Sequence, residues 1–94
     1  MTILITAATS AEAHRLKKNQ ATETIILGDY QDLPAFMKIV KLPNPASMSY
    51  AHEMLTLCLD KGIEKVYALR EEEWSNLLKA GQLFNEYGIE ISSQ

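Results

Sequence analysis

Short apolar runs alternate with longer amphipathic segments along the whole of this chain. The runs are rich in Ile, Leu and Val, which is typical of parallel strands buried on both faces. The segments between them carry apolar residues at helical spacing. The pattern therefore predicts strands over residues 2–6, 24–27, 38–42, 66–69 and 89–91. It predicts helices over residues 10–20, 33–37, 44–61 and 71–87.

Two of these helices have a sequence signal for their first residue. Thr9 and Glu12 are spaced as a capping box, in which the Thr9 hydroxyl accepts from the Glu12 N–H group and the Glu12 carboxylate accepts from the Thr9 N–H group. Asn44 followed by Pro45 is typical of a cap and a first helical position. We therefore expect the first helix to begin at residue 10 and the third at residue 45.

The helix expected over residues 44–61 has a wider apolar face than a sheet requires. Its polar residues fall on one arc about 100° wide, and the rest of its circumference is apolar. Tyr50, Met54 and Leu57 lie on that apolar part. We therefore expect a second neighbour for this helix, either the last helix or another protein, and take these three residues as candidate interface residues.

Alternation of strands and helices predicts an α/β domain, with a parallel sheet between two helical layers. Five strands fit two common doubly wound orders, the flavodoxin-like 2-1-3 arrangement and the Rossmann-like order 3-2-1-4-5. In the third run Lys38 and Lys41 flank Ile39 and Val40, a composition more common at a sheet edge than in its centre. This favours the second order, so we expect one three-layer Rossmann-like domain that is complete within residues 1–94.

In that order the first and fourth strands are neighbours at the switch point, where ligands bind in such folds. The loop after the first strand reads Thr-Ala-Ala-Thr-Ser over residues 6–10 and lacks the glycines of a dinucleotide loop. A structural turn is the favoured interpretation. The N–H groups of Thr9 and Ser10 would still meet an anion bound at the helix start.

Charged residues follow two other strands. Arg70 stands directly before Glu71, Glu72 and Glu73, and we expect it to pair with one of these glutamates. Asp29 follows the second strand, where a dinucleotide fold places an acid for a ribose hydroxyl, although such a residue more often simply ends the strand. The candidate ligand-binding residues are Thr9, Ser10, Asp29, Arg70 and Glu71.

The remaining reactive residues predict no catalysis. His14 and His52 lack a partner at metal-ligand spacing, so we expect them on the surface and expect no metal or cofactor. Cys58 lies in an apolar stripe and is expected to be a core thiol. An enzyme acting alone is our third hypothesis, because its only acid–base candidates are the three consecutive glutamates.

The charge of the chain and its N-terminal residues limit the kinds of binding partner and the cellular compartment that we expect. The formal net charge is −3, and the only basic cluster is Arg15, Lys17 and Lys18, which argues against nucleic acid. The apolar N-terminal run is too short for a signal peptide or a membrane span. We therefore expect a cytoplasmic protein that binds neither nucleic acid nor membrane.

Four segments resemble the N-terminal pre-ATP-grasp domain of carboxylate–amine ligases, such as the carbamoyl-phosphate-synthase-like group. They are Ile-Leu-Ile-Thr-Ala-Ala-Thr-Ser-Ala, Ile-Ile-Leu-Gly-Asp, Val-Lys-Leu-Pro-Asn-Pro and Val-Tyr-Ala-Leu-Arg-Glu-Glu-Glu-Trp. The resemblance implies that the crevice loops serve an acceptor-substrate site while a following ATP-grasp domain binds ATP and magnesium. It carries over to Thr9, Ser10, Asp29, Arg70 and Glu71. Where the family has a glycine after the first strand, this chain has alanine and threonine.

Two functions from different classes follow. The first is a non-catalytic Rossmann-like domain that acts by association, as a homodimer or with a separate ATP-grasp ligase chain. Right-handed crossovers put only the first helix on one sheet face, so we expect apolar surface to remain exposed near strands four and five. The alternative is a domain that binds an amino acid or a nucleotide in the crevice at the ends of strands one and four.

Overall fold

The computed structural model describes residues 1–19 and 23–93 and has the predicted Rossmann-like architecture. All strand pairs are parallel, and the strand order is β3-β2-β1-β4-β5. The strands are β1 (Thr2–Ile5), β2 (Thr24–Asp29), β3 (Val40–Lys41), β4 (Lys65–Tyr67) and β5 (Glu90–Ser92). The helices are α1 (Ala11–Asn19), the 3-10 turn η1 (Ala35–Met37), α2 (Tyr50–Lys61), α3 (Glu71–Lys79) and α4 (Gly81–Glu86).

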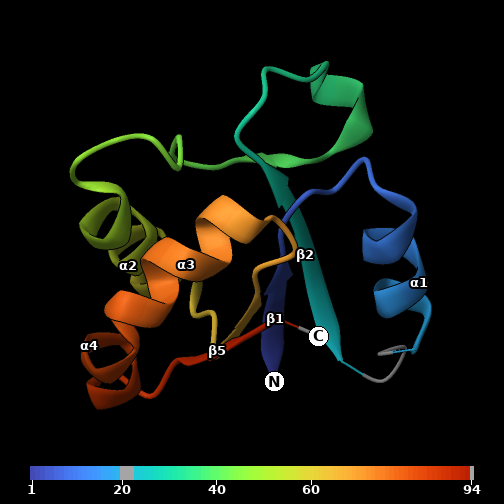
Figure 1. Cartoon of the computed structure of the whole chain (residues 1–94). Coiled ribbons are helices and arrows are strands. Elements are labelled where there is room, and N and C mark those ends of the chain that lie inside the picture. The colour runs from blue at the N-terminus through green and yellow to red at the C-terminus, as the bar shows by residue number, and fades with distance from the viewer. Residues whose placement is uncertain (20–22, 94) are drawn as a thin grey trace.

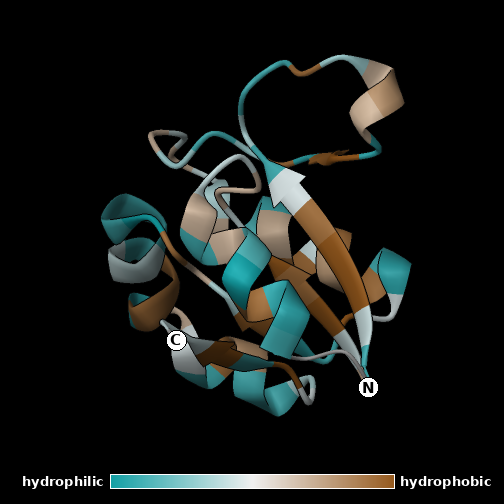
Figure 2. Cartoon of the chain, turned by 90° about the vertical axis from the view of Figure 1, so that its right-hand side faces the viewer, coloured by the Kyte–Doolittle hydropathy of each residue, from teal (hydrophilic) through white to brown (hydrophobic). Residues whose placement is uncertain are grey.

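The sheet separates two hydrophobic cores of unequal size. Helix α1 covers one face alone, while α2, α3 and α4 cover the other (Figure 1). The larger core joins Leu4 and Val66 of the sheet to Leu77 and Phe84 of the helices. The smaller one packs Ile5 and neighbouring side chains against α1, whose outer surface is hydrophilic (Figure 2). No helix within residues 1–19 and 23–93 is long and apolar enough to cross a membrane.

Helix α1 is capped one residue later than expected. The Ser10 hydroxyl, and not that of Thr9, accepts from the Ala13 N–H group at 3.1 Å. The backbone at Ala7 has φ 51°, a left-handed conformation that the chain adopts here without glycine. The expected end of this helix at residue 20 lies outside the described residues.

Helix α2 begins at Tyr50, later than the Asn44–Pro45 signal predicted. The Asn44 side chain accepts from the Ala46 N–H group at 2.9 Å, which closes a local turn in place of a helix cap. The hydroxyls of Ser47 and Ser49 both donate to the Glu53 carboxylate, at 2.8 and 3.0 Å. These side-chain bonds hold the approach to α2 in a non-helical form.

The predicted helix over residues 71–87 is two helices. Helix α3 ends at Lys79, and α4 begins at Gly81 after a break at Ala80. Gly81 follows this break, and a Cβ atom there would meet nothing within 4 Å. Gly81 therefore makes no tight contact.

The expected interface on α2 is wrong at two of its three residues. Tyr50 is 2% exposed and Met54 is fully buried, because the last helices pack against this face of α2. The second neighbour that the wide apolar arc required is thus within the chain itself. Leu57 is partly buried and keeps some exposed surface.

The sheet face beside α1 is less apolar than expected near β4 and β5. Tyr67 is only 6% exposed, and the Lys65 ammonium lies 4.8 Å from the centre of its ring. Lys65 also pairs with Glu90 of β5 at 3.0 Å. A charged pair and a shielded tyrosine therefore occupy the part of this face that we expected to be an exposed apolar patch.

Two glycines give opposite predictions for alanine substitution. A Cβ atom at Gly28 would lie 2.8–2.9 Å from the buried Leu42 side chain, so Gly28→Ala should destabilise the fold by about 1–3 kcal/mol through overpacking. Gly81→Ala should cost nothing or stabilise by up to about 1 kcal/mol, because it adds helix propensity in open space. Chemical denaturation of both variants tests this, and equal losses would contradict the packing assigned to Gly28.

Candidate functional site

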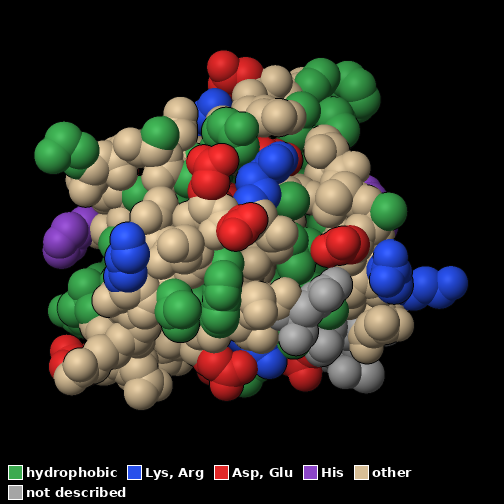
Figure 3. Space-filling model, viewed as in Figure 1, with side chains coloured by type: hydrophobic (Ala, Val, Ile, Leu, Met, Phe, Trp, Pro, Cys, Tyr) green, Lys and Arg blue, Asp and Glu red, His purple; other side chains and the backbone are tan. Residues whose placement is uncertain are grey.

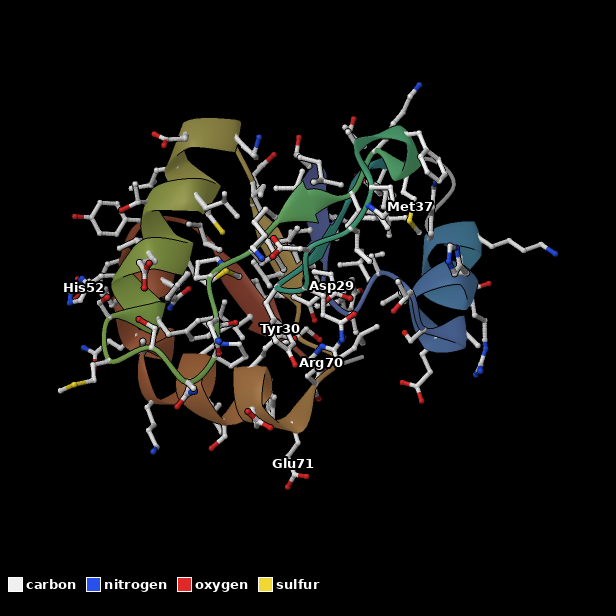
Figure 4. The ribbon with its side chains drawn as sticks, turned by 90° about the horizontal axis from the view of Figure 1, so that it is seen from above. Asp29, Tyr30, Met37, His52, Arg70 and Glu71 are labelled. Atoms are coloured by element: carbon white, nitrogen blue, oxygen red, sulfur yellow. The ribbon has the colours of Figure 1, made fainter. Side chains whose placement is uncertain are left out.

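A partly buried ion pair lies at the carboxyl ends of the strands. Asp29 is the last residue of β2 and is fully buried. Arg70 is the residue before α3, and its Nη2 atom lies 3.1 Å from each Asp29 carboxylate oxygen. The two side chains point toward one another across the end of β1, as Figure 4 shows. The order of the strands thus joins two candidates that are distant in sequence.

Two further contacts fix this pair. The Gln31 N–H group donates to Asp29 Oδ1 at 3.3 Å, in a turn directly after β2. The Arg70 guanidinium carbon lies 5.0 Å from the centre of the Tyr30 ring, a cation–π distance. The guanidinium is therefore held by a carboxylate and an aromatic face, while its side chain stays 30% exposed.

Arg70 and Tyr30 border an open hollow of about 640 Å³, which we call the Arg70 hollow. One face of α3 forms much of its lining, and Asn76 of that face donates to the Pro45 carbonyl at 2.8 Å. Acidic side chains lie beside basic ones over the start of α3 on the face that Figure 3 shows. The residues lining the hollow are Tyr30, Pro45, Arg70, Glu71, Glu72, Ser75 and Asn76.

The structure brings together only part of the predicted site. Arg70 and Glu71 line the hollow, and Asp29 lies behind Arg70 as its partner. The Glu71 side chain extends outward at the rim (Figure 4). Thr9 and Ser10 do not line the hollow: Thr9 is exposed, and Ser10 caps α1 on the other side of the sheet.

The expected pairing of Arg70 with a following glutamate is wrong. The guanidinium donates instead to both carboxylate oxygens of Asp29. A buried carboxylate gains more from a cation than exposed ones do, since water already solvates the latter. Burial of Asp29 therefore decides which acid Arg70 binds.

Glu73 differs from the two glutamates before it, although nothing in the sequence distinguished the three. It is fully buried, and within the described part of the chain neither of its carboxyl oxygens has a hydrogen-bond partner of good geometry. Burial raises the pKa of Glu73, and the neighbouring Thr6 hydroxyl and Arg70 guanidinium offset only part of that rise. The three consecutive glutamates thus have unequal environments, which the sequence did not indicate.

The other reactive residues lie apart from the hollow. His14 and His52 are exposed, as expected, and His52 is on the outer side of α2 (Figure 4). Cys58 is a buried thiol, and burial raises its pKa to about 12, so it is a core residue as predicted. Residues 1–19 and 23–93 contain no group of three or more His, Cys, Asp or Glu placed to hold a metal ion.

Comparison with models of known protein families and with curated proteins finds no match to this chain. The site is therefore interpreted from its own geometry. Its chemistry is that of a fixed cation, an aromatic face, two exposed carboxylates and an amide around an open hollow. Such a set can bind a small polar molecule through charge and hydrogen bonds.

Removing the cation tests the energetics of the pair. Arg70→Ala should destabilise the domain by about 3 kcal/mol, because it leaves Asp29 buried and unpaired. Lys41→Ala is the matched control: it breaks an exposed pair with Asp32 and should have no measurable effect on unfolding in urea. Equal effects of the two substitutions would show that Asp29 does not depend on Arg70.

Proposed function

We propose that this chain is a non-catalytic binding domain that holds a small amino compound, such as an α-amino acid, in the Arg70 hollow. The observation that carries this proposal is the pair between buried Asp29 and partly exposed Arg70, which fixes a guanidinium beside the hollow. Nη2 is occupied by Asp29, whereas no contact described above engages Nη1. A ligand carboxylate would find a preorganised donor there.

The charges of the hollow favour an amino acid over a nucleotide. Asp29 compensates Arg70, so the exposed carboxylates of Glu71 and Glu72 are left without a cation in the lining. They attract an ammonium group and repel a phosphate. The side chains of Ser75 and Asn76 add hydrogen-bonding groups on the same face of α3.

A charge reversal at the rim tests the ligand class. An amino acid from a panel of the common twenty, added in excess, should raise the melting temperature of the wild-type domain, whereas ATP should not. In Glu72→Lys, about ten times more ligand should be needed for the same shift, because the substitution replaces an attraction to the ligand's ammonium group by a repulsion. Glu12→Lys makes the same charge change on α1 and should leave the shift unaltered.

Two results would contradict this proposal. One is the absence of a thermal shift with every amino acid in the panel. The other is a shift with ATP that Glu72→Lys strengthens, since that would make the hollow an anion site. Isothermal titration calorimetry with the amino acid that raises the melting temperature gives the binding stoichiometry. It should be one ligand per chain for binding in a single hollow.

A second function, association with another chain, is favoured by a different observation. Phe36 is 82% exposed and Met37 is 40% exposed on η1, which projects beyond the carboxyl end of β2 (Figure 1). Exposed large apolar side chains side by side are a common feature of contact surfaces. The partner would be a second copy or, if the pre-ATP-grasp resemblance is real, a separate ATP-grasp ligase chain.

Sedimentation velocity tests self-association. If two copies meet through η1, the sedimentation coefficient should rise with concentration for the wild type and stay constant for Phe36→Ser. Met48→Ser removes another exposed apolar side chain, at the approach to α2, and should behave as the wild type. A concentration-independent monomer in all three proteins would rule out the homodimer.

A further inference from the structure

The interior beside Arg70 contains polar groups that no described contact satisfies. The Tyr50 hydroxyl, the Arg70 Nε atom and both Glu73 oxygens are buried without a hydrogen-bond partner among residues 1–19 and 23–93. Thr6 and Asp29 are fully buried in the same region. Since buried polar groups are nearly always paired, a cluster of this kind needs a physical explanation.

The number of acids and cations in this cluster explains why the Glu73 oxygens lack a partner. The cluster contains two buried carboxyl groups, those of Asp29 and Glu73, and a single guanidinium. Asp29 takes that guanidinium through both oxygens, at 3.1 Å each. An ionised Glu73 would then be a second buried negative charge with no cation of its own, which is a costly arrangement.

The groups around Glu73 come from four elements. Burial raises the pKa of Tyr50 of α2, and Glu73, which faces it, raises that pKa further, as does Cys58 of α2 to a smaller extent. Asp29 of β2 raises the pKa of Glu73 further, whereas Arg70 and the Thr6 hydroxyl after β1 lower it. Burial is the largest of these effects, so the neutral acid is favoured.

We propose that Glu73 is a proton-binding site, which keeps its proton in the folded domain at pH values where an exposed glutamate has lost it. The neutral carboxyl can donate a hydrogen bond to the Tyr50 or Thr6 oxygen. On ionisation, Glu73 would instead attract the buried Nε atom of Arg70, so that both carboxylates share one guanidinium. Protonation of Glu73 therefore sets how firmly Arg70 is held by Asp29.

This inference goes beyond the proposed ligand and needs no ligand for its test. In the unfolded chain Glu73 titrates near the ordinary pKa of about 4.3. Below that pH both states hold the proton, and the folded state gains or loses nothing. Above it the unfolded state loses the proton first, so stability falls as pH rises until Glu73 ionises in the folded state as well.

Glu73→Gln tests the sign of this dependence. The amide cannot ionise, so the variant should melt close to the wild type at pH 4 and about 4 °C or more above it at pH 8. Glu72→Gln is the matched control, because Glu72 is exposed on the same helical turn. Its ionised carboxylate favours the start of α3, so this variant should gain no stability over the wild type as pH rises. A difference for Glu73→Gln that stays constant or falls as pH rises would overturn the proposal.

A measurement on the wild type keeps the proposal testable if the variant folds poorly. Carboxyl ¹³C NMR of the glutamates should show one resonance whose titration midpoint lies above the ordinary glutamate value and above the midpoints of the other glutamates. Trp74, the only tryptophan, follows Glu73 directly, and its fluorescence should change with the same midpoint. Ordinary titration of every glutamate would overturn the proposal. Failure to bind any amino acid would leave this titration unchanged, so the two proposals fail separately.

Discussion

The ion pair between Asp29 and Arg70 joins the end of β2 to the start of α3 over a separation of 41 residues. Strand β1 lies between the two strands that lead to these residues, and its end carries the small residues Thr6 and Ala7, which leave room for the side chains to meet. The pair orients Arg70, Arg70 stacks on Tyr30, and both border the hollow with α3. The candidate site thus depends on one ion pair, in which the carboxylate is buried and the guanidinium is partly exposed.

Burial explains why Arg70 pairs with Asp29 and not with the exposed glutamates at the start of α3. Exposed carboxylates at the start of α3 interact favourably with the helix dipole and need no arginine. Asp29 has no water to solvate it, and the removal of its partner would leave a buried charge. The same reasoning makes Glu73 the group that keeps a proton, since the single guanidinium of the cluster is already engaged. One cation between two buried acids therefore explains both the geometry of Arg70 and the unpaired oxygens of Glu73.

The sequence was sufficient for the sheet and insufficient for the details of its connections. Lysines on both sides of Val40 and Ile39 indicated an edge strand, and that single cue selected the correct strand order. The start of α2 was wrong because the Asn44 side chain closes a turn, a role that asparagine fills as readily as a helix cap. The wide apolar arc of α2 was read correctly as needing a neighbour, but the neighbour is internal.

The sequence singled out Asp29, Arg70 and Glu71 but not the contact between the first two, and it also proposed Thr9 and Ser10, which do not line the hollow. Asp29 and Arg70 were each placed at strand ends, and their pairing was missed because three glutamates adjoin Arg70 in sequence while Asp29 does not. Glu73 had a usable signal: it lies four residues before Leu77 and eleven before Phe84, on the buried stripe of its helices. The burial of Glu73 can be predicted from the helical spacing of the apolar residues. The partner of Arg70 can be predicted only when the strand order is known as well.

A double-mutant cycle on Asp29 and Arg70 tests the central claim most directly. Asp29→Asn and Arg70→Met are made singly and together, and the free energy of unfolding is measured for all four proteins. The structure predicts a coupling energy of about 2 kcal/mol or more, because Arg70→Met alone leaves the Asp29 charge buried without its cation, whereas in the Asp29→Asn background there is no such charge to leave unpaired. Additive effects of the two substitutions would show that these side chains do not interact. Asp29 would then not hold Arg70 at the hollow, which contradicts the account of the site.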